Sequence, residues 1–264
     1  MSAQPTFEDV LYEIRGRAAW ITINRPKLYN AFRAQTVEDL IKAFQTAADD
    51  RGVSVVVLTG AGDKAFCTGG DQSAHEGNYD GRGVVGLPMD ELQSIIRDIP
   101  KPVIARVNGF AIGGGNVLAT LCDLTIASST AQFGQVGPKV GSVDAGWGTA
   151  YLARLVGEKK AREIWYLCRR YTADEACQMG LVNKVVPADQ LDAEVEAWCA
   201  EISERSPTAL ALAKRSFNCD TEQIRGISQF ALNTVKLYYA TEESKEGVRA
   251  FNEKRTPDFH KFVR

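Results

Sequence analysis

The chain has 264 residues, with 45% apolar and 24% charged side chains, which is typical of a globular protein with one large core. Its net charge of -2 argues against nucleic acid as the main partner, because binding phosphates requires concentrated positive charge. With no apolar run of about 18 residues and no basic-then-apolar N-terminus, we expect neither a membrane span nor a secretory signal, and therefore a cytoplasmic protein.

The first half of the chain alternates predicted strands and helices. An alternation of apolar and polar residues predicts a strand over 7–15, which a hairpin through Gly16 joins to a second strand over 18–23. The apolar side chains of 37–48 recur on one face of a helix. The rest of this half consists of one predicted helix, at 90–98, and four predicted strands, at 53–58, 103–107, 124–127 and 131–133.

From Trp147 onward the pattern is almost wholly helical. The run Thr172 to Glu175 is a capping box, in which two side chains satisfy backbone N–H groups at a helix start. Pro207 opens another helix at a position where proline is tolerated. Repeated β-then-α units before a helical tail predict an α/β fold, with a core over residues 1–200 and a helical segment over 201–264.

The cysteines and histidines limit the side-chain chemistry of this chain. The six cysteines contain no C-x-x-C pair and are interpreted as reduced core residues of a cytosolic protein. Cys67, close to a glycine pair, is the alternative candidate for a reactive thiol. With only two histidines, His75 and His260, no zinc-ligand cluster can be assembled, and we expect no metal site.

Two glycine clusters are the first candidates for a functional site. One, 66–71, contains Gly69 and Gly70, and the other, 112–116, contains three consecutive glycines before an apolar helical stretch. Glycines at strand-to-helix turns let the backbone approach a ligand and present free N–H groups to it. Two such turns can supply two donors to one oxygen, as an oxyanion requires. The alternative is that glycine serves only the conformation of a tight turn.

These clusters, together with Asn24-Arg25-Pro26 and Asn30-Ala31, resemble the enoyl-CoA hydratase/isomerase (crotonase) superfamily over nearly the whole chain. The resemblance implies a crotonase fold, a spiral of repeated ββα units with a C-terminal helical segment. It implies an acyl-CoA substrate and no separate cofactor, since CoA is part of the substrate. It implies that the N–H groups of Gly70 and Gly114 hold the thioester oxygen. It also implies that Asn30 and Ala31 lie along the CoA adenine and ribose.

The same resemblance bears on assembly and on reaction type. Members of the superfamily assemble as homotrimers or homohexamers, so we expect the helical tail to reach a neighbouring subunit. Its hydratases carry two catalytic glutamates, whose matching positions here are Val117 and Gly137. Because neither side chain can transfer a proton, hydration of an enoyl double bond by that route is not expected.

A closer resemblance is to the 1,4-dihydroxy-2-naphthoyl-CoA synthase family. It is carried by the segments 133–148, 157–165 and 251–259. It implies that Ser142, Asp144 and Tyr239 surround the ring being formed, and that Lys254 meets a CoA phosphate. Without the resemblance, Tyr239 would be interpreted as a packing aromatic.

Three positions depart from the synthase pattern. Val136 replaces the threonine of a bicarbonate site, and Gly137 lacks the aspartate that takes the place of bicarbonate in other synthases. Arg82 stands where the synthases have an active-site tyrosine. The loop 73–83 instead resembles 2-ketocyclohexanecarboxyl-CoA hydrolase, a C–C hydrolase of aromatic and alicyclic acid degradation.

Several candidate residues keep a second interpretation. Asp144 is assigned acid–base chemistry; the alternative is that it is a turn carboxylate that accepts hydrogen bonds from nearby N–H groups. His75 is a candidate proton acceptor, because histidine has a suitable pKa near neutrality; the alternative is an exposed loop histidine. Arg82 is either a substrate or CoA contact or a surface charge. Asp71 is expected to cap the first glycine turn. Asp71 and Gln72 are also candidates for contact with the substrate or CoA.

The sequence thus predicts hydrolytic C–C cleavage of a cyclic β-ketoacyl-CoA, of the 2-ketocyclohexanecarboxyl-CoA to pimeloyl-CoA type. Water polarised by Asp144, with Ser142 or Tyr239, adds to the ring ketone, and the breaking C–C bond leaves a thioester enolate. Two alternatives stay open. One is ring closure by the naphthoyl-CoA synthase route, and the other is a catalytically silent acyl-CoA- or RNA-binding homologue.

Overall fold

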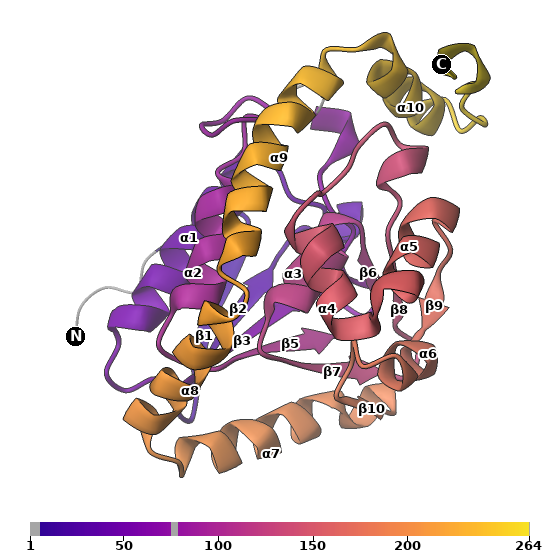
Figure 1. The fold of residues 1–264 in the computed structure, drawn as a ribbon. Helices are drawn as coiled ribbons and strands as arrows, with labels where there is room; N and C mark the ends of the chain where they lie inside the picture. Colours follow the sequence, from indigo (N-terminus) through magenta and orange to yellow (C-terminus); the bar gives the residue numbers. More distant parts are fainter. Residues whose placement is uncertain (1–5, 75–78, 264) are drawn as a thin grey trace.

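A computed structural model describes residues 6–74 and 79–263, and its core consists of two sheets enclosed by helices (Figure 1). The larger sheet has the order β1-β2-β3-β5-β7-β10 and the smaller β4-β6-β8-β9. Only the β1–β2 and β8–β9 pairs are antiparallel among the described strands. The strands are β1 (Val10–Arg15), β2 (Ala18–Ile23), β3 (Val55–Gly60), β4 (Ala65–Cys67), β5 (Val103–Val107), β6 (Phe110–Ile112), β7 (Leu124–Ser128), β8 (Gln132–Gly134), β9 (Tyr171–Thr172) and β10 (Lys184–Val186).

Consecutive pairs of strands build the predicted spiral, since each pair gives one strand to each sheet and is followed by a helix. The units are β3-β4-α2, β5-β6-α3 and β7-β8-α4. The helices as far as residue 178 are α1 (Ala34–Asp49), α2 (Met89–Asp98), α3 (Gly114–Leu121), α4 (Leu152–Val156), α5 (Glu158–Leu167) and α6 (Ala173–Gln178). Because β4, β6 and β8 are adjacent and parallel, the loops that follow them meet at one edge of the smaller sheet.

The valine-rich strand β3 is buried on both faces, as its sequence indicates. Val56 and Leu58 pack into the larger core cluster, whereas Val55 and Val57 pack into a second cluster closed by α7 (Leu191–Ser203). Successive side chains of a strand point to opposite faces, so one strand serves two cores.

Local signals in the sequence are confirmed in several places. Gly16 turns the β1–β2 hairpin with a φ of +59°. The capping box of α6 forms, with the Glu175 N–H donating to Thr172 Oγ1 at 3.2 Å. The short strands β9 and β10 interrupt the second half, which the pattern had indicated to be almost wholly helical.

The C-terminal helices are α8 (Pro207–Cys219), α9 (Gln223–Tyr239) and α10 (Glu242–Asn252), and the boundary expected after residue 200 falls inside α7. Helix α9, the long gold helix of Figure 1, packs back on its own chain, because Ile224, Val235 and Tyr239 belong to the larger core cluster. None of the helices in the described ranges has the length and apolar content needed to cross a membrane.

Candidate active site

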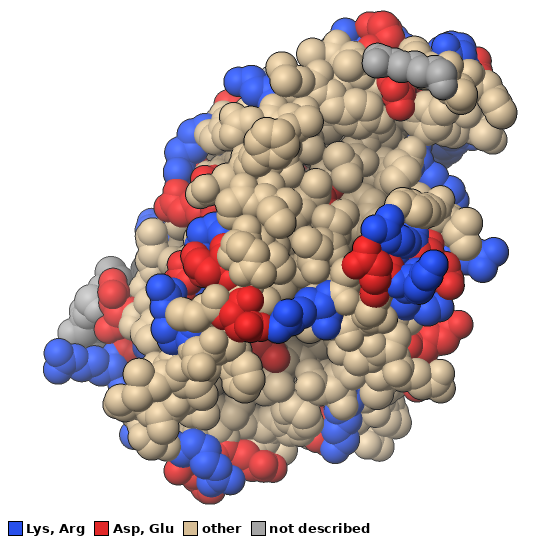
Figure 2. All heavy atoms as spheres, viewed as in Figure 1, with Lys and Arg blue, Asp and Glu red and all other residues tan. Residues whose placement is uncertain are grey.

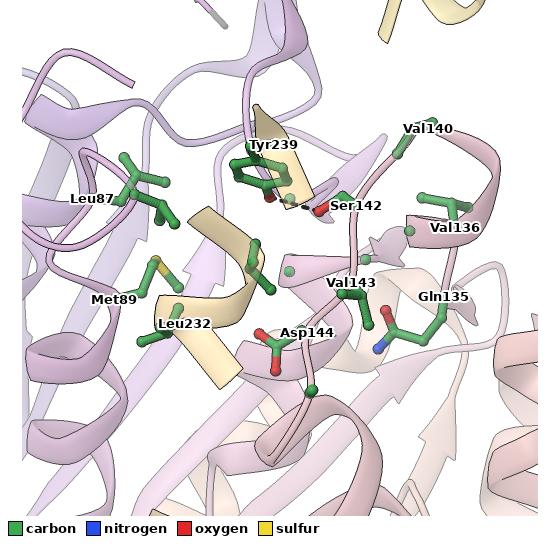
Figure 3. A pocket seen from close by; sticks show the side chains of 18 of the residues that line it. Leu87, Met89, Gln135, Val136, Val140, Ser142, Val143, Asp144, Leu232 and Tyr239 are labelled. Atoms are coloured by element: carbon green, nitrogen blue, oxygen red, sulfur yellow. Dashed lines mark hydrogen bonds between the residues drawn. The ribbon is translucent and has the colours of Figure 1, made fainter. Parts of the chain in front are cut away.

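The three loops that meet at the edge of the smaller sheet line one cavity, and one face of α9 covers it (Figure 3). Its volume of about 120 Å³ is several times the roughly 10–15 Å³ of such space that one buried water needs. The lining residues are Phe32, Thr68, Gly69, Gly70, Gln72, Tyr79, Val85, Leu87, Met89, Gly113, Gly114, Gln135, Val136, Gly137, Val140, Ser142, Val143, Asp144, Ala145, Trp165, Ser228, Ala231, Leu232, Val235 and Tyr239.

Gly70 lies where the first glycine turn crosses Phe32 in an isolated parallel bridge. Phe32 N donates to Gly69 O at 2.8 Å, and Asp71 N donates to Phe32 O at 2.9 Å. In such a bridge the N–H of the middle residue, Gly70, points away from Phe32. A Cβ at Gly70 would lie 1.9 Å from the Tyr79 hydroxyl oxygen, so a side chain here would force the Tyr79 ring to move.

Gly114 is the first residue of α3, so its N–H has no carbonyl partner within that helix. The two glycine turns are in contact, because a Cβ added to Gly69 would lie 3.0 Å from Gly114 N. Gly69 has a φ of +87° and Gly113 a φ of +57°, conformations that favour glycine. The turns therefore place Gly70 and Gly114 at one cavity, and their use as an oxyanion hole stays a prediction.

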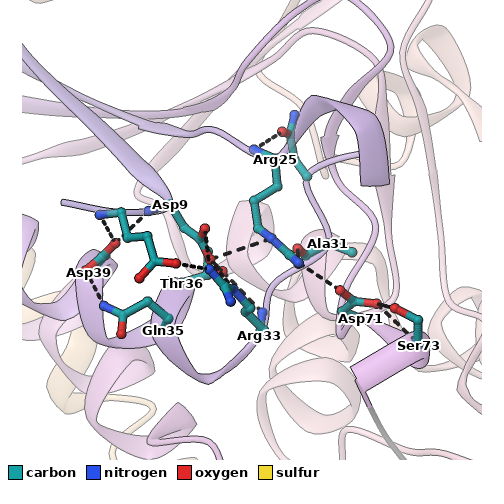
Figure 4. A network of polar contacts seen from close by, with 11 residues as sticks. Asp9, Arg25, Ala31, Arg33, Gln35, Thr36, Asp39, Asp71 and Ser73 are labelled. Carbon is teal, nitrogen blue, oxygen red and sulfur yellow. Dashed lines mark hydrogen bonds and ion pairs between the residues drawn. The ribbon is translucent and has the colours of Figure 1, made fainter.

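A network of charges holds the first glycine turn (Figure 4). Asp71 pairs with Arg25 at 2.9 Å and accepts hydrogen bonds from Ser73 N and Oγ at 3.0 and 2.6 Å. Burial acts to raise the pKa of Asp71, but these partners outweigh it and leave the pKa below its usual value. Asp71 therefore braces the turn, as expected, and does not line the cavity, whereas the neighbouring Gln72 does.

Asn30 and Ala31 belong to this bracing network. The fully buried Asn30 amide donates to Ala61 O and Ala65 O at 3.0 and 2.7 Å, and its oxygen accepts from Arg25 N. The Arg25 guanidinium donates to Ala31 O. The polar atoms of the Asn30 side chain are therefore engaged within the chain. That the segment of Asn30 and Ala31 lies along the CoA adenine and ribose stays a prediction.

Asp144 lies in the loop before η4 (Trp147–Tyr151), with its carboxylate at the cavity (Figure 3). Gly148 N donates to Oδ1 at 2.9 Å, and Gln93 Nε2 donates to Oδ2 at 3.4 Å. Burial raises the pKa of Asp144 to about 6, against the lowering effect of these two hydrogen bonds. A carboxylate that changes protonation near neutral pH inside a cavity is suited to acid–base work.

Ser142 and Tyr239 form a hydroxyl pair beside Asp144, with 2.7 Å between Oγ and Oη. Burial raises the pKa of Tyr239; the bond to Ser142 lowers it and the charge of Asp144 raises it, so the net shift is upward and the phenol stays neutral. Tyr239 comes from α9 of the same chain. Tyr239 therefore reaches the cavity of its own chain, and the expectation that the helical tail also reaches a neighbouring subunit stays a prediction.

The positions of the hydratase glutamates carry no acid. Val117 is fully buried in α3 and lies outside the lining, whereas Gly137 and Val136 line the cavity. A Cβ at Gly137 would lie 2.5 Å from Ser142 O. The loop that places Ser142 therefore excludes an aspartate at position 137.

Two further predicted residues, Arg82 and Lys254, do not line the cavity. Arg82 is exposed and pairs with Glu38 and Glu91 at 2.6 and 2.5 Å. Lys254 is exposed just beyond α10, in a left-handed conformation with a φ of +55°. Their contacts with CoA stay predictions. His75 lies outside the described residues.

The six cysteines are free thiols, four of them buried. Cys67 is fully buried, and burial raises its pKa to about 12, against the lowering effect of a hydrogen bond from Gly69 N. A thiol that stays protonated is a poor nucleophile. The structural interpretation of Cys67 is thus confirmed.

Two polar side chains of the site escaped the sequence analysis. Tyr79 lines the cavity from the loop in which Arg82 replaces the synthase tyrosine, and its hydroxyl lies against Gly70. Burial raises the pKa of Tyr79, which keeps the phenol neutral. Gln93, on the inner face of α2, is 1% exposed and donates to Asp144. Both residue types are common in packing, so only the tertiary contacts reveal them.

We predict that Gln93→Met shifts the acid limb of the pH–activity profile upward by up to about one pH unit, because the Asp144 anion loses a donor. A loss of packing alone would lower activity evenly at all pH values. The measurement is kcat between pH 5 and 9, with Gln229→Met on the exposed face of α9 as the matched control. An acid limb that does not move would contradict the role of Gln93.

A crotonase fold with two glycine turns at one cavity defines the class of an acyl-CoA-processing enzyme. Residues 13–262 match the family described as enoyl-CoA hydratase/isomerase, and the chain belongs to this family. The fold predicted from the sequence is thereby confirmed.

Solved structures similar to this chain cover 92–96% of its residues. One is an enoyl-CoA hydratase from Mycobacterium avium subsp. paratuberculosis K-10, with 28% identity, a TM-score of 0.85 and coverage of 96% of this chain and 99% of that chain. Another is a carnitinyl-CoA dehydratase from Mycobacterium avium 104, with 33% identity, a TM-score of 0.83 and coverage of 92% and 96%. A third is an enoyl-CoA hydratase/isomerase from Pseudoalteromonas atlantica T6c, with 28% identity, a TM-score of 0.85 and coverage of 96% and 100%.

Proposed function

We propose that this enzyme hydrolyses a C–C bond of a cyclic β-ketoacyl-CoA, as in the opening of 2-ketocyclohexanecarboxyl-CoA to pimeloyl-CoA. The observation that carries the proposal is the position of Asp144. Its carboxylate shares one cavity with Gly70 and Gly114, while the two hydratase glutamate positions hold Val117 and Gly137. The site therefore has one base for water and two backbone donors for an oxyanion.

Water activation is the first step of the proposed reaction. Asp144, ionised above about pH 6, accepts a proton from water as the water oxygen attacks the ring ketone. The Ser142–Tyr239 hydroxyl pair, 2.7 Å across, lies beside this position and can donate to the ketone oxygen as negative charge develops on it. The apolar lining around Asp144 strengthens both interactions because it excludes bulk water.

Cleavage of the C–C bond is the second step. The bond between the hydrated ketone carbon and the α-carbon breaks, and its electron pair enters the thioester as an enolate. The N–H groups of Gly70 and Gly114 stabilise the enolate oxygen. The α-carbon then takes one proton originating from water, and the new carboxyl group releases the other. The sum is one cyclic thioester plus one water giving one ω-carboxyacyl-CoA.

Ring closure by the naphthoyl-CoA synthase route is the second candidate, because Ser142, Asp144 and Tyr239 are brought together as that family's pattern implies. Closure requires a base for the α-proton of the thioester. In the synthases that base is bicarbonate or an aspartate, and the matching positions here are Val136 and Gly137, both of which line the cavity. This loss favours opening over closure.

The test offers the purified enzyme three thioesters separately. We predict that 2-ketocyclohexanecarboxyl-CoA gains the mass of one water and that o-succinylbenzoyl-CoA does not lose a water. We also predict that crotonyl-CoA is not hydrated, because Val117 and Gly137 supply neither acid nor base. Mass spectrometry in oxygen-18 water locates the added oxygen in the new carboxyl group. Water loss from o-succinylbenzoyl-CoA would make the enzyme a synthase, and inertness toward all three would favour a silent homologue.

Self-association as a trimer or hexamer also remains part of the proposal. Figure 2 shows a largely uncharged surface over α9, with basic and acidic side chains mixed around it. The outer side of α9 exposes Ile227, Phe230 and Leu237, which recur at helical spacing. Exposed apolar faces of this kind favour contact with another protein surface, and a second copy is the partner that the family resemblance implies.

A further inference from the structure

Charge is distributed unevenly in the cavity that holds Asp144. Among the described lining residues, Asp144 is the only side chain that carries charge at neutral pH, and no lysine or arginine accompanies it. The rest of the cavity wall includes apolar side chains, among them Leu87, Met89 and Leu232 (Figure 3). An acyl group that enters this chamber therefore meets one negative charge and no described cation.

The groups packed around Asp144 from each element are neutral. Helix α2 contributes the Gln93 amide and η4 the Gly148 N–H. Helix α9 contributes the neutral hydroxyl of Tyr239. Arg97, one turn beyond Gln93, is directed elsewhere, since its guanidinium stacks 4.5 Å over the Trp147 ring and donates to Thr221.

We propose that this cavity selects acyl groups without a negative charge and that Asp144 expels the carboxylate which ring opening creates. The inference rests on the proposed function and names its substrate class as neutral cyclic ketoacyl thioesters. Ring opening turns a neutral ketone carbon into a carboxylate at the position where Asp144 activated the water. Two carboxylates then share an apolar chamber, and such a pair repels or is forced to bind a proton. Release of the product follows from its own charge.

The repulsion depends on pH because Asp144 titrates. Burial raises the pKa of Asp144 to about 6, so at pH 8 it is an anion and at pH 5 it is mostly neutral. A terminal alkyl carboxyl group, with an ordinary pKa of about 4.3, stays mostly ionised at both values. Discrimination against a carboxylate should therefore be strong at pH 8 and weak at pH 5.

The test compares two ligands that differ only at the far end of the acyl chain: pimeloyl-CoA and its ω-carboxamide, which has the same shape without the charge. Isothermal titration calorimetry on the intact enzyme at pH 8 should show the carboxamide binding at least about tenfold more tightly. The ratio should fall toward one at pH 5. In Asp144→Asn it should be near one at both pH values, while Asp90→Asn, an exposed acid of α2, should keep the wild-type ratio.

Equal affinity of the wild-type enzyme for the two ligands at pH 8, or a ratio that survives in Asp144→Asn, would overturn the proposal. Because binding is measured without turnover, this failure is separate from failure of the proposed reaction. An enzyme that opens the ring but shows no charge discrimination would retain the function and lose the inference. An enzyme that discriminates but opens no ring would do the reverse.

Discussion

Replacing Asp144 by asparagine should lower kcat for ring opening by about a hundredfold or more, the loss expected when general-base catalysis is removed. Asparagine keeps the size of the side chain and an oxygen that can accept from Gly148 N, but it cannot take a proton from water. The wild-type activity should fall as pH decreases through about 6, since the raised pKa of Asp144 leaves the base protonated below that value. In Asp144→Asn this acid limb should be absent. Steady-state kinetics between pH 5 and 9 measure both effects.

Binding of an unreactive analogue separates catalysis from substrate recognition in this experiment. Cyclohexanecarboxyl-CoA lacks the ketone, so it makes no contact that depends on the charge of Asp144. Its affinity for Asp144→Asn should therefore remain within about a factor of two of the wild-type value, the size of effect typical of a substitution that removes no important interaction. Asp90→Asn provides the matched loss of a carboxylate outside the cavity and should keep the full kcat. A persistent limb near pH 6 in Asp144→Asn would assign the base to another group, of which His75 is the sequence candidate.

Much of the fold was predictable because its signals are local and periodic. The double burial of β3 follows from its run of valines, and the start of α6 follows from the Thr172–Glu175 capping box. The strands β4, β6, β9 and β10 were not predicted, because each has only two or three residues and shows no clear period of two. Their pairing with neighbouring strands of the two sheets makes them strands.

The candidate site was predictable where backbone geometry requires a residue type. The Tyr79 hydroxyl occupies the space where a Cβ of residue 70 would stand, and Gly114 begins a helix. Both positions therefore hold glycine, within clusters that can be recognised in the sequence. Gln93 could not be predicted from the sequence, because its partner Asp144 lies 51 positions away and the contact exists only in the folded chain. The structural role of Asn30 was not predictable for the same reason. Its amide donates to Ala61 O and Ala65 O, more than 30 positions along the chain, and these contacts exist only in the folded protein.

The same geometry sets the second large effect, because the position of Gly114 leaves no space for a side chain. A Cβ at this residue would lie 2.8 Å from Phe32 Cζ and 3.3 Å from Gly69 Cα. Phe32 in turn forms the bridge that orients Gly70. Gly114→Val should therefore displace both backbone donors, one directly and one through Phe32.

Gly114→Val should lower kcat by about a hundredfold or more, since removing one oxyanion donor alone typically has that effect. The matched control is Gly226→Val, because Gly226 lies on α9 with open space where a Cβ would stand. Both variants are compared by far-UV circular dichroism and by thermal unfolding, so that a folded but inactive Gly114→Val is recognised. Infrared difference spectra of bound cyclohexanecarboxyl-CoA, labelled at the thioester carbonyl, report the donors without turnover. The carbonyl stretch should shift to lower frequency in the wild-type enzyme and in Gly226→Val but not in Gly114→Val. A folded Gly114→Val that keeps the wild-type kcat and the wild-type shift would show that Gly114 is not part of an oxyanion hole.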